Sequence, residues 1–220
     1  MRGRKVILPE KIDLGLAELI GIHFGDGNLY HSASNYNYQI TYAGNLKEEV
    51  DYMLHIENLF TFYFGVKMTH QKYKKMNSYL LRVRSKEIFL FMNKFLEIPI
   101  GPKNSLSIPS FITKEKSLSL AFIRGLFDTD GCIIVQRDKT YRYVLVKIST
   151  KCEEFAKEIS NLLLDLKFSN YICKSKTKYD IVIRSKVCVE NFFNEVKPNN
   201  LKKVNAYKKY MDIYYGLGGI

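Results

Sequence analysis

A nine-residue segment that ends in Asp-Gly occurs twice in this chain and constrains its fold more than any other feature. The copies are LIGIHFGDG at residues 19–27 and IRGLFDTDG at residues 123–131, and both carry Gly at the third position. They lie 104 residues apart, and each ends an apolar run. Self-similarity at a fixed spacing indicates repeated structural units, so we expect two halves of similar architecture.

A second pair of similar segments supports the duplication. Tyr79–Lys86 resembles Tyr179–Lys186 at an offset of 100, and an aromatic-rich helical stretch follows each. The two offsets imply halves of about a hundred residues that differ by small loop changes. We therefore expect halves at 1–98 and 118–220, joined by a linker at 99–117 that contains three of the five prolines.

Hydrophobic periodicity predicts the same element order in both halves, namely helix, two strands, helix, two strands and helix. The expected helices are 14–25, 47–64, 88–96, 118–129, 153–166 and 189–196. The expected strands are 28–31, 38–42, 66–73, 79–84, 132–136, 143–149, 171–175 and 179–184. This order predicts an α+β fold with antiparallel sheets.

The charge balance points to a polyanionic partner. Lys and Arg number 34 against 22 Asp and Glu, giving a net charge of +12 and a pI near 9.4. Such values are typical of nucleic-acid binders. A basic membrane-surface protein is the competing class, but no basic amphipathic helix with a clean apolar face stands out, and the apolar runs are too short to span a bilayer. Without a signal peptide, we expect a cytoplasmic protein, or an organellar one if an organelle encodes it.

The cysteines and histidines do not suggest a zinc site. The four cysteines contain no C-x-x-C pair and the four histidines no H-x₃-H set. We expect the cysteines to be reduced and buried.

The strands alternate apolar with basic or polar residues, so each sheet should pack one face on helices and offer the other to a partner. Lys, Arg and Tyr on that second face suit contacts to phosphates and base edges, whereas the alternative is an ordinary solvated face. The candidate DNA-contacting residues are Lys72, Tyr73, Arg82, Arg84, Arg137, Lys147, Lys174, Lys176 and Arg184.

Both nine-residue segments resemble the signature motif of the LAGLIDADG homing endonucleases. The second copy retains Gly, Leu and both Asp positions, whereas Phe24 replaces the first Asp in the first copy. Two copies, each followed by the β-β-α-β-β-α order, resemble the single-chain, two-motif branch of that family. The resemblance implies pseudo-twofold duplicated αββαββα halves whose antiparallel sheets form a DNA-binding saddle.

Small residues four apart would let the two motif helices pack closely, with Gly21 and Gly25 on one helix and Gly125 and Thr129 on the other. Asp26 and Asp130 would then meet at the helix ends, where a divalent cation relieves their repulsion. The alternative is that Gly-Asp-Gly and Thr-Asp-Gly merely end helices.

The resemblance implies that Asp26 and Asp130 bind Mg²⁺, with Mn²⁺ or Ca²⁺ as possible substitutes, aided by the carbonyls of Gly25 and Thr129. Because Phe24 occupies the position that matches Asp128, we expect Asp128 to order the helix end. Phe127 matches His23, so we expect His23 to be a packing residue.

The family also places a lysine near each cleaved phosphate, just before the final helix of each half. By position this implies Lys103 in the first half, and Lys202 or Lys203 in the second. A lysine in a solvated loop is the alternative in each case. The polar residue expected after the second strand of each half corresponds to Tyr42 and Thr150, or to neighbours such as Asn45 and Lys151.

The resemblance implies an Mg²⁺-dependent endonuclease that makes a double-strand break in duplex DNA at a long, asymmetric site. Since the halves differ in sequence, one chain can read a non-palindrome as a monomer, and an intron-encoded homing enzyme is the expected setting. Two alternatives use the same fold: a maturase that binds intron RNA, and a non-catalytic DNA-binding regulator. Retention of both Asp26 and Asp130 argues against the regulator but not against the maturase.

Overall fold

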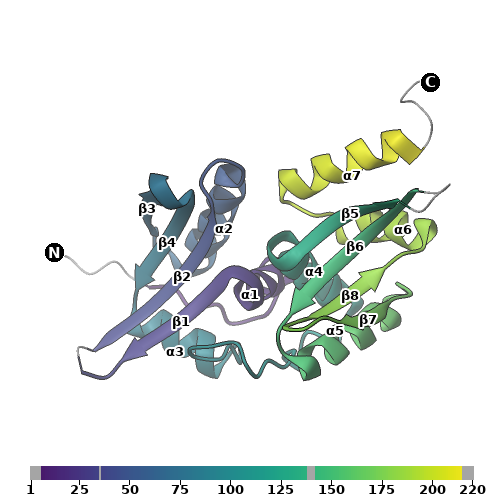
Figure 1. Cartoon of the computed structure of the whole chain (residues 1–220). Coiled ribbons are helices and arrows are strands. Elements are labelled where there is room, and N and C mark those ends of the chain that lie inside the picture. Colours follow the sequence, from purple (N-terminus) through teal and green to yellow (C-terminus); the bar gives the residue numbers. More distant parts are fainter. Residues whose placement is uncertain (1–5, 35, 138–141, 215–220) are drawn as a thin grey trace.

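The computed structural model describes residues 6–34, 36–137 and 142–214, and it shows two halves with the same element order (Figure 1). The first half consists of α1 (Leu14–Asp26), β1 (Gly27–Ser32), β2 (Asn37–Asn45), α2 (Val50–Phe64), β3 (Thr69–Tyr73), η1 (Lys74–Met76), β4 (Ser78–Arg84) and α3 (Lys86–Lys94). The second consists of α4 (Lys116–Asp130), β5 (Gly131–Arg137), β6 (Arg142–Thr150), α5 (Glu153–Asp165), β7 (Tyr171–Lys174), β8 (Tyr179–Ile183), α6 (Lys186–Val196) and α7 (Leu201–Tyr214).

Local residue chemistry sets several of these boundaries. Asp13 caps α1 by accepting a hydrogen bond from the Leu16 N–H at 2.9 Å, and Ser85 caps α3 through the Ile88 N–H at 3.3 Å. Gly65 ends α2 in the left-handed conformation, at φ 68°, which favours glycine. The predicted helix and strand order is confirmed.

Each half forms a four-stranded antiparallel sheet, with strand orders β1-β2-β4-β3 and β5-β6-β8-β7. Alternate residues such as Ile40, Leu81 and Val83 are buried in the core shared with the helices. The residues between them lie on the opposite, helix-free face of the sheet. The predicted α+β fold with two antiparallel sheets is confirmed.

Helices α1 and α4 pack side by side at the centre of the molecule and join the two halves (Figure 1). A Cβ atom on Gly21 would overlap the backbone oxygen of Phe122, and one on Gly125 would overlap that of Glu18. A Cβ atom on Gly25 would overlap the Thr129 hydroxyl. The predicted small-residue contact therefore exists, and glycine is required where two backbones touch.

The same interface contains a buried charge cluster. The Glu18 carboxylate, 3% exposed on α1, accepts hydrogen bonds from Arg124 Nη1 on α4 at 3.1 Å and from Asn199 Nδ2 at 2.7 Å. His55 Nε2 on α2 lies 2.7 Å from the same carboxylate. Burial opposes ionisation of Glu18, but these partners hold its pKa below the usual value. The cluster ties both halves together.

Two expectations need correction. Helix α7 was not predicted, and it forms because its inner face packs on the second half, with Tyr207 stacked on Phe193 at a centroid distance of 3.8 Å. The cysteines are free, as expected, but only Cys152 is buried, whereas Cys173 is exposed on an edge strand. Cys173 is exposed because β7 packs on the sheet along one edge alone.

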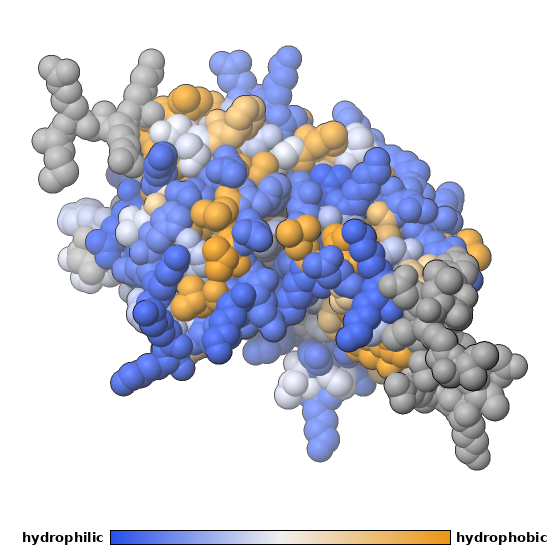
Figure 2. Space-filling view, turned by 90° about the horizontal axis from the view of Figure 1, so that it is seen from above, coloured by the Kyte–Doolittle hydropathy of each residue, from blue (hydrophilic) through white to orange (hydrophobic). Residues whose placement is uncertain are grey.

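The surface seen from above is largely hydrophilic, with hydrophobic residues in scattered groups (Figure 2). Among the residues that the structure describes, no helix combines the length and apolar character needed to cross a membrane.

Candidate active site

Asp26 and Asp130 end the two central helices, and both side chains reach solvent. Crowding by surrounding protein and the negative charges of Asp130 and Glu49 raise the pKa of Asp26 to about 7. Burial likewise raises the pKa of Asp130, while Lys103 and Lys203 oppose the rise. The two carboxylates are thus electrostatically coupled acids at the junction of the halves.

One lysine from the linker and one from the second half lie near this pair of carboxylates. Lys103 Nζ donates a hydrogen bond to the backbone oxygen of Gly25, and Lys203 Nζ donates one to that of Gly131. Burial lowers the pKa of both lysines, and the nearby carboxylates oppose this shift for Lys103. Two partly buried cations therefore flank two acids, although the two acceptor carbonyls are not at equivalent positions of the two motifs.

In the second half, the structure brings Lys203 rather than Lys202 into the site. Lys202 points to the first half, where its Nζ lies 2.7 Å from Glu48. The offset of 100 residues that relates Tyr79–Lys86 to Tyr179–Lys186 also relates Lys103 to Lys203. That offset is the sequence signal that separates the two candidate lysines.

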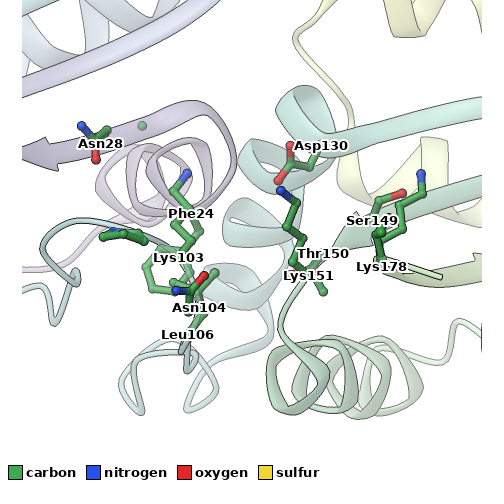
Figure 3. Close-up of a pocket in the computed structure, with 13 residues that line it drawn as sticks. Phe24, Asn28, Lys103, Asn104, Leu106, Asp130, Ser149, Thr150, Lys151 and Lys178 are labelled. Carbon is green, nitrogen blue, oxygen red and sulfur yellow. The ribbon is translucent and has the colours of Figure 1, made fainter. Parts of the chain in front are cut away.

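A cleft of about 540 Å³ opens beside Asp130, between the two halves (Figure 3). Phe24, Asn28 and Lys103 line one side, and Asp130, Ser149 and Lys178 line the other. Asn28 and Ser149 lie on the helix-free faces of their sheets. Asp130 and both helix-free faces therefore open to the same region of the surface.

The donor set suits a hard divalent cation. Asp26 and Asp130 supply carboxylate oxygens, and the carbonyls of Gly25 and Thr129 lie beside them in the chain. Burial, and then the charges of Asp130 and Glu49, raise the pKa of Asp26, and a bound cation would favour its ionised form. No cluster of three or more His, Cys, Asp or Glu side chains that could hold a metal occurs in the described part of the chain, so further ligands would come from carbonyls, water or substrate.

Other motif residues have structural roles. Asp128 is fully buried, and its Oδ2 accepts a hydrogen bond from the Asn199 N–H at 2.7 Å, so it holds the turn before α7. His23 is buried, as expected, with Nδ1 3.2 Å from the Tyr42 hydroxyl. The Thr129 hydroxyl donates back within α4, to the carbonyls of Gly125 and Leu126.

Of the residues considered after the second strand, Tyr42 faces the core and contacts His23, away from the cleft. Thr150 and Lys151 line the cleft. Asn45 caps the loop before α2 through the N–H groups of Lys47 and Glu48. The register pairs Gly27 with Tyr42 and Gly131 with Ile148, so Tyr42 and Thr150 are not equivalent positions.

The candidate DNA-contacting residues divide between faces. Tyr73, Arg82, Arg84 and Lys147 lie on helix-free faces, by strand alternation and register. Lys176 is exposed in the β7–β8 turn, and Arg184 is exposed after β8. Arg137 ends β5, and its side chain lies outside the described residues.

Lys72 and Lys174 lie on the helix side of their edge strands, one residue out of phase with the helix-free face. Lys72 Nζ lies 5.0 Å from the centre of the Tyr79 ring, and Lys174 Nζ lies 5.3 Å from that of Tyr179. Each lysine thus covers an aromatic ring at an equivalent position. Both lysines therefore lie off the helix-free faces that form the candidate DNA surface.

Residues 117–197 match the family model of the LAGLIDADG-like domain. This match lies in the second half, where the motif is better preserved. An uncharacterized protein of Methanocaldococcus jannaschii is 24% identical over 166 residues, which cover 74% of this chain and 59% of that protein. The chain thus matches less than two thirds of that relative's length.

Solved LAGLIDADG homing endonucleases share the overall fold of the chain. I-DmoI in complex with DNA and Mn aligns with a TM-score of 0.60 and 23% identity, over 83% of this chain and 95% of its own. The LAGLIDADG meganuclease I-AabMI bound to uncleaved DNA aligns with a TM-score of 0.65 and 13% identity, over 93% and 92%. The single-chain LAGLIDADG fold implied by the sequence is confirmed.

Proposed function

We propose that this protein is a site-specific DNA endonuclease that makes a double-strand break at a long, asymmetric target by Mg²⁺-dependent phosphodiester hydrolysis. The observation that carries the proposal is the pairing of Asp26 and Asp130 at the joined helix ends, flanked by Lys103 and Lys203. Complexes of similar structures with DNA and Mn or Ca support DNA as substrate and a divalent cation as cofactor.

In this proposal each residue acts near one of the two scissile phosphates. Asp26 and Asp130 hold Mg²⁺, with Mn²⁺ or Ca²⁺ as substitutes, and the bound metal supplies activation of water and stabilisation of the leaving oxygen. Lys103 and Lys203 place positive charge where phosphate charge increases in the transition state. One composite site thereby serves two DNA strands.

The proposal extends to the setting of the enzyme. The halves 1–98 and 118–220 would each bind about one helical turn (~10 bp), with 99–117 as the linker between them. Because the halves differ in sequence, a monomer is sufficient for an asymmetric target. We further propose that it is intron-encoded and promotes homing.

The test is cleavage of a library of long DNA duplexes in Mg²⁺. We expect paired cuts on both strands, and a loss of at least about a hundredfold in rate for Asp26→Asn and for Asp130→Asn, as is usual when charge stabilisation at a reacting centre is removed. Duplex binding by both variants should survive, because phosphate contacts dominate affinity. Lys202→Ala is the matched control for Lys203→Ala, and only the latter should slow cleavage.

Two other outcomes would each indicate a different function for this protein. Tight binding of structured intron RNA with no cut in any duplex would favour a maturase. Specific duplex binding without cleavage in Mg²⁺, Mn²⁺ or Ca²⁺ would favour a regulator and reject the nuclease.

A further inference from the structure

The two helix-free faces carry different chemistry at equivalent positions. The register aligns Gly27 with Gly131 and Leu81 with Ile181, because each occupies the same place in its pairing. In the middle row across the first sheet, Asn28, Thr41 and Arg82 lie side by side. The equivalent row in the second sheet contains Cys132, Lys147 and Val182.

The neighbouring rows continue this contrast. Gln39 pairs with Arg84 in the first sheet, and the position equivalent to Gln39 in the second is Leu145. Arg84 keeps a counterpart in Arg184, so the difference lies in the inner rows and at Leu145. Nearer the cleft the contrast is reversed, and the first sheet is the apolar one. Ala43 pairs with Leu80 there, whereas Ser149 pairs with Asp180 in the second sheet.

Leu145 and Val182 show that the apolar character of the second face is not an extension of the core. They are only 8% and 5% exposed, yet they lie outside the continuous hydrophobic core to which their neighbours Val146 and Ile181 belong. Ile134 pairs with Leu145, and Tyr171 pairs with Val182. These four side chains form an apolar strip on the helix-free face, and Tyr171 is its most exposed member at 48%.

The first face is equipped for hydrogen bonding instead. Arg82 Nε is buried and has no hydrogen-bond partner in the structure, and a buried donor of this kind calls for one. Arginine pairs with guanine O6 and N7 in the major groove, and glutamine pairs with adenine N6 and N7. Arg82, Arg84 and Gln39 therefore suit purine edges.

Asp180 is an acid, only 9% exposed, on the sheet face proposed to bind a polyanion. Its carboxylate accepts hydrogen bonds from Ser149 Oγ at 2.6 Å and Lys147 Nζ at 3.2 Å, and Lys178 Nζ lies 3.6 Å away. Burial opposes ionisation, but these partners keep the pKa of Asp180 below its usual value. An ionised carboxylate whose charge is balanced by two lysines suits the N4 amino group of cytosine, which is a hydrogen-bond donor.

We propose that the two sheets read unlike half-sites: β1–β4 binds guanine and adenine edges, whereas β5–β8 binds thymine methyl groups through Leu145 and Val182 and one cytosine through Asp180. The proposal rests on the proposed function and specifies its target. The C5-methyl group is the only apolar feature in the major groove, so an apolar strip there can recognise thymine alone among the four bases.

The test is selection of duplexes from a pool with a randomised segment of about 20 bp, which covers one helical turn for each half. The full chain is incubated in EDTA so that no duplex is cut. We expect an asymmetric consensus with purines at discrete positions in one half-site and thymines in the other. Arg82→Ala should alter base preference in the purine half-site alone, which assigns each half-site to its sheet.

Deoxyuridine then removes the methyl groups without altering base pairing. In the half-site bound by β5–β8, each contacted thymine replaced by uracil should weaken binding about fourfold, the factor that corresponds to ~0.8 kcal/mol for a buried methyl-sized group. Uracil in the other half-site should leave affinity unchanged. Val182→Thr, which preserves side-chain shape, should abolish the penalty at its own position, and a melting curve checks that it folds.

Asp180→Asn separates base reading from phosphate binding. We expect it to lose a preference for cytosine of about tenfold at one position. If Asp180 only anchors the lysines, the variant will bind all duplexes more tightly with unchanged preferences, which would overturn its assignment. A symmetric consensus, or equal uracil sensitivity in both half-sites, would overturn the proposal as a whole. If no duplex is enriched, the proposed function itself fails, and this inference fails with it.

Discussion

Asp128 is a fully buried carboxylate with one oxygen bonded to the Asn199 N–H and the other, Oδ1, without a partner in the structure. Burial raises the pKa of Asp128 to about 7. A raised folded-state pKa means that the contribution of Asp128 to stability is greatest below pH 4 and declines as pH rises through about 7. At pH 8 the protein holds an uncompensated buried charge.

We therefore expect Asp128→Asn to be at least as stable as the parent at pH 8. Asparagine keeps an oxygen for the Asn199 N–H and removes a charge whose unpaired burial costs ~1–3 kcal/mol. Thermal melts at pH 5 and pH 8 check this, with a gain at pH 8 of roughly 2–4 °C per kcal/mol. A variant less stable than the parent at pH 8 would show that the ionised carboxylate is required.

Asp26 and Asp130 give a second prediction at this scale, since their charges repel when no cation is bound. At pH 8 without metal, Asp130→Asn should raise Tm, because it removes one of the two charges. In the parent, Mg²⁺ at a hundred times its Kd should stabilise the folded state by ~2.7 kcal/mol and so raise Tm. The variant should lose this response, and an equal Mg²⁺ effect in parent and variant would place the cation elsewhere.

The α1–α4 pair depends on glycine at the two points where the helices touch. Gly21→Ala and Gly125→Ala would force the backbones apart, because each new methyl group meets a backbone oxygen of the facing helix. We expect losses of ~1–3 kcal/mol, the usual range for overpacking, measured by urea unfolding. Gly15→Ala in α1 is the matched control, since its methyl group would meet the hydroxyl end of the Tyr63 side chain and no backbone atom of a facing helix.

The elements could be predicted to different degrees. Motif helices and strands follow from periodicity and from the duplication, which supplies each pattern twice. Helix α7 has no counterpart in the first half, and its inner face relies on Tyr207 and Tyr210, whose packing depends on the second half already being folded. Its existence is a tertiary effect that local pattern does not reveal.

At the scale of the whole molecule, the site could be predicted in part. The repeated Asp-Gly pair led to Asp26 and Asp130. Lys202 and Lys203 are adjacent in α7, so besides the 100-residue offset it is the orientation of that helix that distinguishes them. Lys72 and Lys174 were expected on the helix-free face, but they lie on the helix side. The sequence does not fix the phase of a short edge strand, and a shift of one residue exchanges its two faces. Glu49, which acts on Asp26 from the start of α2, belongs to no motif.

The halves share one core through α1 and α4, so we expect neither to fold alone. A fragment ending at residue 98 would expose the α1 face that carries Gly21 and leave Glu18 without Arg124. Circular dichroism and NMR of that fragment should show little fixed structure, and mixing it with residues 99–220 should restore the fold. A fragment with a cooperative melting transition of its own would contradict this.

The Glu18–Arg124 contact also bears on which halves can associate with each other. The 104-residue offset places Ile20 in the first half where the second half has Arg124. If two copies of the first half came together as a homodimer, two Glu18 carboxylates would be buried at the junction with no guanidinium to neutralise them. The buried ion pair therefore favours the association of two unlike halves over the association of two identical ones.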